Sequence, residues 1–269
     1  MVMPTEGQLV AGRFRLIETI ARGRFAALQR AHDLQTGRTV VLRRIEESLP
    51  SPEVRQQLMH EGSILAGLSH RNLPKVLETI EDGETVYLIL EDFRAWPLEE
   101  YLQGMGQPPS ERLLWRLLDQ MLSVIGYLHE QDPPIVHRDL RPDSLLISQD
   151  ATILVVDFGL ATLRHVPGRT VFRALGSPSY AAPEQLGGMP SSPRNDIYSI
   201  GATLYYLATG TPPPPSRKLY DGSAHLSFLR DDLSPRFVEI VYTLMHPESD
   251  ARPSTIGAVE DLLYRCLLY

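Results

Sequence analysis

The segment 137–144 limits the possible folds and functions of this chain more than any other stretch. It reads HRDLRPDS, and the triplet DFG follows at 157–159 after a short, mostly apolar run. Asp139 and Asp157 therefore stand in two motifs, one before and one after that run. In such a pattern the first acid lies beside an incoming hydroxyl group and the second holds a metal ion. The pattern predicts a phosphoryl-transfer centre built on these two acids.

Further segments stand in a fixed order around the two motifs. They are the loop ARGRFA at 21–26, the strand VVLRRI at 40–45, a helix with Glu61, the triplet APE at 182–184, then Asp196 and Arg252. With these motifs the chain resembles the bacterial-type serine/threonine protein kinases over about residues 14–263. A glycine-containing loop alone is a weak sign, whereas a whole series of motifs in the family's order is specific.

The resemblance implies an α+β fold with two lobes, in one kinase-like domain over 1–269. The N-lobe, about 10–93, is expected to hold an antiparallel sheet and one long helix, and the C-lobe, about 97–269, to be mainly helical. Apolar residues alternate in the first part and recur at helical spacing afterwards, which agrees with this division. Strands are predicted near 14–20, 27–33, 39–46, 76–81 and 85–91, and helices after Ser51, over 110–129 and over 197–207.

The resemblance also implies ATP as a cofactor, with Mg²⁺ or Mn²⁺. The residues that it assigns to the nucleotide are Ala21, Gly23, Phe25, Leu28, Val41, Arg43, Leu90, Glu91, Phe93 and Leu146. Ala21 and Ala26 stand at two of the glycine positions of the phosphate loop, and each added methyl group restricts the backbone. Val41 stands where the family usually has an alanine above the adenine ring. We expect nucleotide binding to be weak.

The catalytic residues implied by the resemblance are Asp139, Arg141, Arg43 and Glu61. Arg43 replaces the family's lysine, and a forked guanidinium does not position phosphates as an ammonium does. It is expected to keep an ion pair with Glu61 while misplacing the phosphate contact, at a loss of about 3 kcal/mol or roughly a hundredfold in rate. Arg141 also replaces a lysine, and its donors suit phosphate oxygens.

The metal ligands implied by the resemblance are Asp157 and, weakly, Ser144, which replaces an asparagine. A hydroxyl on a one-carbon stem is expected to reach a metal only through water or a backbone shift. Arg138 is expected to receive a phosphate from the activation segment, where Thr170 and Ser177 are the candidate acceptors. The alternative is that this segment is an ordinary polar surface loop.

Two interpretations of the function follow. In the first, the phosphate and metal site is degraded, and the domain acts in signalling as a pseudokinase, by binding proteins. In the second, the chain is a slow but genuine serine/threonine kinase, because Asp139, Asp157, Glu61 and Glu184 are present. A small-molecule kinase is a distant third, since the APE triplet and the loop before it suit protein substrates.

Composition limits the classes of partner and the cellular location that we expect for this chain. A net charge of −7 and a pI near 5.6 argue against a nucleic-acid partner, which would need a basic face. No apolar stretch is long enough for a membrane span, and a single cysteine suits a reducing compartment. We expect a cytoplasmic protein, or a cytoplasmic domain of a longer one, that meets a protein substrate or signalling partner. Homodimerisation is left open.

Overall fold

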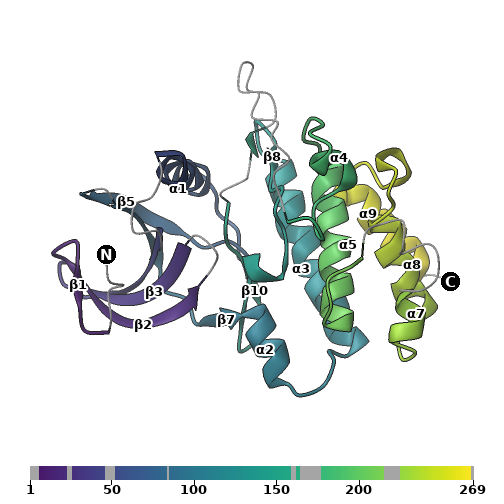
Figure 1. Cartoon of the computed structure of the whole chain (residues 1–269), viewed down its shortest axis with the longest axis horizontal. Coiled ribbons are helices and arrows are strands. Elements are labelled where there is room, and N and C mark those ends of the chain that lie inside the picture. The colour runs from purple at the N-terminus through teal and green to yellow at the C-terminus, as the bar shows by residue number, and fades with distance from the viewer. Residues whose placement is uncertain are drawn as a thin grey trace. The chain divides into compact units, whose positions relative to one another are not determined.

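The computed structural model describes residues 6–22, 26–45, 52–83, 85–158, 162–163, 177–214 and 225–267. They fall into two compact units (Figure 1). Unit 1 consists of Met1–Leu98 and Leu146–Gly159, and unit 2 consists of Glu99–Leu145 and Leu160–Tyr269. The predicted α+β class, with a sheet-rich first part and a mainly helical second part, is confirmed.

Unit 1 is built on a six-stranded antiparallel sheet in the order β1-β2-β3-β4-β6-β5. Its strands are β1 (Leu9–Val10), β2 (Phe14–Arg22), β3 (Ala26–Asp33), β4 (Thr39–Ile45), β5 (Val76–Asp82) and β6 (Thr85–Glu91). The five predicted strands are present with ends shifted by no more than two residues among those described. The two-residue β1 was not predicted, because it is too short for an alternating pattern to be visible.

Helix α1 (Pro52–Leu65) packs against β4, β5 and β6. It begins at Pro52, the residue predicted for its first position, and the predicted cap Ser51 lies outside the described residues. Gly62 lets the helix approach the sheet closely, because a Cβ atom there would lie 2.6 Å from Cδ2 of Leu88. This close approach fixes the helix that carries Glu61.

A second, three-stranded sheet in unit 1 has the order β10-β9-β7. Its strands are β7 (Ala95–Pro97), β9 (Leu145–Ser148) and β10 (Ile153–Val155). The buried Asn72 ties β10 in place, because its Nδ2 donates to the carbonyl of Ile153 and its carbonyl accepts from the amide of Val155, at 2.7 and 2.8 Å. Asp157 follows two residues after this anchored strand.

Leu77 corrects one prediction. Leu65, Leu77, His137 and Phe158 match an apolar stack of the family, yet Leu77 is 48% exposed, whereas the other three are almost fully buried. The register of β5 against β6 shifts between Val76 and Glu78, so Leu77 is the extra residue of a β-bulge. The bulge turns the Leu77 side chain outward, which an unaligned sequence does not reveal.

Unit 2 is mainly helical. Its longer helices are α3 (Glu111–His129), α5 (Pro193–Thr209), α8 (Pro235–Leu244) and α9 (Ile256–Leu267), and its shorter ones are α2 (Leu98–Gly104), α4 (Pro183–Leu186) and α7 (Leu226–Leu229). The other described elements of unit 2 are two 3₁₀ turns (Pro142–Ser144 and Ser249–Ala251) and two short strands. The strands, β8 (Ile135–Val136) and β11 (Thr162–Leu163), pair with each other.

Helices α3 and α5 form the centre of unit 2. The helix predicted over 110–129 begins one residue later, because Ser110 is its cap: the Ser110 hydroxyl accepts from the amide of Leu113 at 3.3 Å. The helix α5 is buried along most of its length and packs against α3 and α8. It extends beyond the predicted 197–207 in both directions, because Ser192 and Pro193 start it and Gly210, with φ of 71°, ends it. Within the described part of the chain, no helix is both long and apolar enough to cross a membrane.

Candidate functional site

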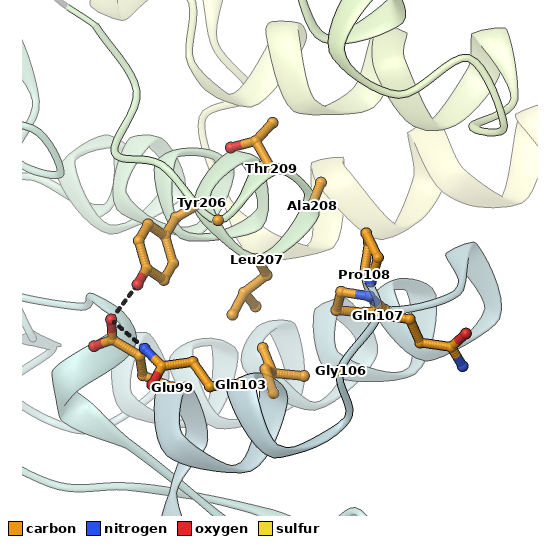
Figure 2. A pocket seen from close by; sticks show the side chains of 12 residues that line it. Glu99, Gln103, Gly106, Gln107, Pro108, Tyr206, Leu207, Ala208 and Thr209 are labelled. Atoms are coloured by element: carbon orange, nitrogen blue, oxygen red, sulfur yellow. Dashed lines mark hydrogen bonds between the residues drawn. The ribbon is translucent and has the colours of Figure 1, made fainter.

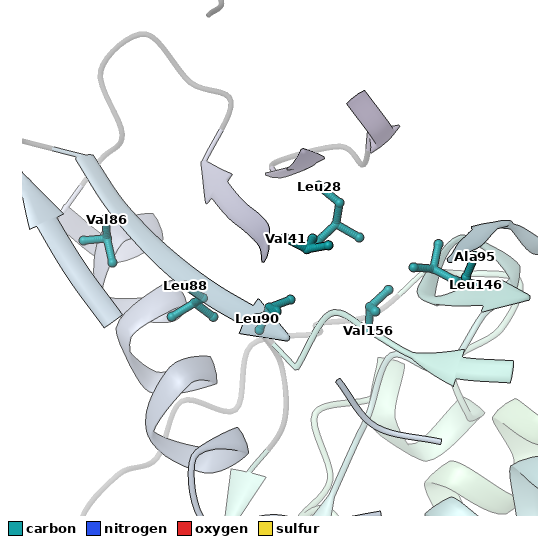
Figure 3. Packing of buried hydrophobic residues seen from close by; sticks show 8 residues of the cluster. All are labelled: Leu28, Val41, Val86, Leu88, Leu90, Ala95, Leu146 and Val156. Carbon is teal, nitrogen blue, oxygen red and sulfur yellow. The ribbon is translucent and has the colours of Figure 1, made fainter. Parts of the chain in front are cut away.

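A buried apolar cluster in unit 1 gathers several of the residues assigned to the nucleotide (Figure 3). Its members are Leu28, Val41, Val86, Leu88, Leu90, Ala95, Leu146 and Val156, and Ala21 and Phe93 pack against it while partly buried. Because side chains alternate along β4, Val41 faces this cluster whereas Val40 and Leu42 face a second one. Of the remaining assigned residues, Gly23 and Phe25 lie outside the described part of the chain.

The segment after β6 is held to the sheet by Arg30, a residue that the sequence did not single out. Arg30 donates through Nε to Oδ1 of Asp92 at 2.9 Å and through Nη2 to the carbonyl of Phe93 at 2.7 Å, and it also pairs with Glu18. The exposed Glu91 precedes this clamp, and its amide donates to the carbonyl of Lys75. One arginine thus fixes the chain beside the apolar cluster.

Arg43 lies between two carboxylates within unit 1. Its Nε is 2.8 Å from Oε1 of Glu61, and its Nη2 donates to Oδ1 of Asp157 at 2.9 Å. The ion pair expected with Glu61 is therefore present, and a second pair with Asp157 accompanies it. Burial opposes the charge of Arg43, but the two carboxylates outweigh that effect and raise its pKa.

Glu61 has an unusual pKa. Burial raises it from an ordinary value near 4.5 to about 6, against the opposing effect of Arg43 and with a further rise from the charge of Asp157. Glu61 is 2% exposed, so solvent screens these effects little. The folded state therefore binds a proton at Glu61 more tightly than the unfolded chain does.

This pKa predicts a pH-dependent stability. A raised carboxyl pKa stabilises the fold below about pH 4.5, and that contribution is lost as the pH rises to about 6. Between these values the wild type should lose about 2 kcal/mol of unfolding free energy relative to Glu61→Gln. Urea denaturation of both proteins from pH 4.5 to 6.5 would measure the difference. Parallel curves for the two proteins would contradict the prediction.

Asp157 has a left-handed backbone, with φ of 74°. Aspartate is one of the few residues besides glycine that adopt this conformation with some frequency. The backbone conformation and the anchored strand β10 together present the carboxylate to Arg43.

In unit 2, the buried Asp196 of α5 holds the backbone of the segment 137–144, the catalytic loop that contains Asp139. Its carboxylate accepts from the amides of His137 and Arg138 at 2.9 and 2.8 Å and lies 2.8 Å from Nε2 of His129. Burial disfavours this charge, but the bonds from His129 and the loop hold the pKa of Asp196 below its ordinary value. His129 was not singled out in the sequence, because it lies 67 residues from its partner.

Asp139 and Arg141 lie close together in this loop. Oδ1 of Asp139 accepts from the amide of Ser177 at 3.3 Å, and its Oδ2 is 3.7 Å from Nε of Arg141. Nη1 of Arg141 is 2.7 Å from Oδ2 of Asp143, a residue that the sequence analysis did not assign. Arg141 therefore lies close to two acids of its own loop, and Ser177 lies beside Asp139, the acid that the resemblance implies beside the incoming hydroxyl group.

Ser144 closes the 3₁₀ turn that follows Arg141. Its hydroxyl donates to the carbonyl of Arg141 at 2.8 Å and accepts from the amide of the same residue at 3.0 Å. The side chain is buried, with 1% of the residue exposed. The only proton of this hydroxyl is therefore used within the loop. Its role as a weak metal ligand stays a prediction.

Arg138 is 6% exposed and has a left-handed backbone, with φ of 71°. Its carbonyl accepts from Nε2 of Gln185 at 2.7 Å, and burial lowers the pKa of its guanidinium. Among the described residues, no acid forms an ion pair with it. Thr170, one candidate for a phosphorylated partner, lies outside the described residues.

Unit 2 contains a cavity of about 350 Å³ that the sequence did not predict (Figure 2). It lies between α2, the residues that follow that helix and the end of α5. Tyr206 donates its hydroxyl to Glu99 on the cavity wall, and Nε2 of Gln103 reaches the same carboxylate at 3.4 Å. The wall thus combines one acid with mainly uncharged side chains.

Comparison with known proteins identifies the family. The model of the protein kinase domain matches residues 14–263. The chain is 31% identical to the SNF1-related protein kinase catalytic subunit alpha KIN12 of Arabidopsis thaliana over 86% of its length and 48% of the relative. It is also 31% identical to the serine/threonine-protein kinase ATG1a of Arabidopsis thaliana, over 90% of the chain and 38% of the relative.

A third relative is the serine/threonine-protein kinase PLK4 of Xenopus laevis, 31% identical over 74% of the chain and 21% of the relative. The chain therefore spans about half of the first relative and less of the other two. The family model covers almost the whole chain, including the sheet of unit 1, the segment 137–144 and most of the helices of unit 2. The chain belongs to the protein kinase family.

Proposed function

We propose that this kinase domain is catalytically impaired and acts in signalling through protein binding. The observation that carries the proposal is the hydrogen bonding of Ser144. Its hydroxyl bonds both to the amide and to the carbonyl of Arg141, so it stabilises the turn of its own loop. A group held in this way is a poor replacement for the metal-binding carboxamide of the family.

The second implied metal ligand also fits a magnesium ion poorly. The family uses ATP with Mg²⁺, and Asp157 would hold the ion when nucleotide binds. In unit 1, however, a carboxylate oxygen of Asp157 already accepts from Arg43. Together with Ala21 and Ala26 in the phosphate loop, these features support weak binding of ATP and Mg²⁺ or Mn²⁺.

Other expectations stay part of the proposal. The partner of the domain is a protein. The domain is cytoplasmic and of the bacterial type. Its two lobes span about 10–93 and 97–269. The buried charge of Arg138 supports a regulatory role, because a phosphate on Thr170 or Ser177 would give its guanidinium a direct ion pair in addition to the more distant charge of Asp196. Homodimerisation would be a further level of regulation.

A slow, active serine/threonine kinase is the second candidate. Asp139 is favoured as a working acid, because the amide of Ser177 and the nearby Arg141 hold its carboxylate in place. The ion pair of Arg43 with Glu61 also preserves a feature that active kinases need.

Transfer of labelled γ-phosphate from ATP distinguishes the two candidates. The wild type is assayed with Mg²⁺ and with Mn²⁺, on itself and on a generic basic protein, beside Asp139→Asn. We expect no signal above that of Asp139→Asn, and a rise of about a hundredfold or more in the double variant Arg43→Lys, Ser144→Asn.

The matched control is Arg38→Lys, Ser254→Asn, which makes the same exchanges at two exposed positions. It should stay as inactive as the wild type. A wild-type signal that disappears in Asp139→Asn would show a working kinase and reject the proposal.

A further inference from the structure

We propose that Arg43 is the permanent counter-ion of Asp157 and takes the place that a magnesium ion has at this acid in the family. The inference deepens the function proposed above and rests on it, because it explains why the metal site is impaired. It predicts that folding of this domain, and any nucleotide binding, is indifferent to divalent cations. The contacts that carry it all lie within unit 1.

The first step is the reach of the guanidinium. Arg43 extends from β4 and contacts Glu61 of α1 through Nε and Asp157, after β10, through Nη2. Two nitrogen atoms of one rigid fork thus serve two carboxylates that come from different elements. A lysine has one nitrogen on a flexible stem and would have to share it between the same two acids.

The second step is charge. Two carboxylates and one guanidinium leave a net charge of −1, and the Arg43 and Glu61 side chains are 9% and 2% exposed. The guanidinium stays protonated throughout the accessible pH range. A magnesium ion bound to the carboxylate of Asp157 would lie beside Nη2 of Arg43 and would be repelled by the positive charge of the guanidinium.

The third step is the backbone. Asp157 has its left-handed φ of 74° two residues after the end of a strand that Asn72 anchors through two hydrogen bonds. The carboxylate is therefore presented to Arg43 by the protein alone. An acid that awaited a metal beside buried Glu61 would instead be repelled by that second carboxylate.

An Asp157 paired with Arg43 and an Asp157 that awaits a metal predict opposite effects of Asp157→Asn on the unfolding midpoint. If Asp157 is paired with Arg43, Asp157→Asn removes an attraction, and we expect the unfolding midpoint in EDTA to fall by about 2 °C or more. If Asp157 were an unpaired metal ligand, the same substitution would relieve repulsion with Glu61 and raise the midpoint. A rise, or no change, would therefore overturn the proposal. Asp82→Asn, at an exposed acid of β5, is the matched control.

A second measurement does not depend on a variant that folds. Thermal unfolding of the wild type is recorded in EDTA, in 10 mM MgCl₂ and in 1 mM MnCl₂, each with and without ATP. We expect the midpoints with and without metal to agree within about 1 °C. A metal-dependent rise of several degrees in the wild type would reject the proposal.

These outcomes are separate from those of the phosphate-transfer assay. Phosphoryl transfer by the wild type would reject the proposed function, whereas the sign of the Asp157→Asn effect in EDTA would still report the pairing with Arg43. Conversely, an inactive domain whose unfolding midpoint rises with Mg²⁺ would agree with the proposed function and contradict the proposed role of Arg43 as counter-ion of Asp157.

Discussion

Replacing Glu184 with alanine should lower the free energy of unfolding by about 3–5 kcal/mol, because it leaves a buried cation without its acid. The Arg252 side chain is fully buried and donates to Oε1 and Oε2 of Glu184 at 3.0 and 2.6 Å. Its guanidinium also lies over the ring of Tyr198 and donates to the carbonyl of Arg194. Only the carbonyl bonds would remain to compensate its charge.

Thermal or urea unfolding of Glu184→Ala measures this loss, which corresponds to a midpoint lower by roughly 6–20 °C. The control is Asp250→Ala, which removes the exposed partner of the neighbouring Arg194 at 3.8 Å. Surface pairs of this kind contribute little, so the control should unfold with the wild type. Equal midpoints for Glu184→Ala and the control would show that the pair does not stabilise unit 2.

The second large effect is expected at Asp196. Its carboxylate is fully buried and meets the two amides of His137 and Arg138 and the ring nitrogen of His129. In Asp196→Asn the charge is lost, and the new NH₂ group must face a donor or move away from it. We expect a loss of about 3 kcal/mol in unfolding free energy.

Hydrogen exchange distinguishes this local effect from general destabilisation. The amides of His137 and Arg138 should exchange faster in Asp196→Asn than in the wild type under native conditions, beyond the change seen for amides in the middle of α9. Asp261→Asn, at an exposed position of α9, is the matched control. Unchanged protection of the loop amides would show that Asp196 does not hold the loop.

Local patterns in the sequence predicted the elements well. The helix α3 was predicted from its apolar stripe, which depends on residues within a few turns. The strands of unit 1 followed from alternation, and the ion pair of Arg43 with Glu61 followed from the resemblance. These features depend on neighbouring residues or on an order of motifs shared by a whole family.

The distant contacts that were predicted, Glu184 with Arg252 and Asp196 beneath the loop of Asp139, followed from the resemblance alone. The pair of Arg43 with Asp157 was not predicted, because the two residues are 114 positions apart and no pattern in one sequence indicates that they meet. The bulge at Leu77 depends on register with β6, which is a property of two strands together. The bonds of Ser144 to Arg141 were not predicted either, although they are local: serine often bonds to nearby backbone groups, and that preference was available in the sequence.

The hydrogen bonds of Ser144 have a consequence for the history of this chain. Once the hydroxyl stabilises the turn after Arg141, an ancestral-type asparagine that turns toward a metal gives up both bonds at once. Under the proposed function, Ser144→Asn alone would then weaken the loop while Arg43 still occupies the position of the family's lysine. The proposal therefore predicts that Ser144→Asn alone restores less phosphoryl transfer than the double variant Arg43→Lys, Ser144→Asn.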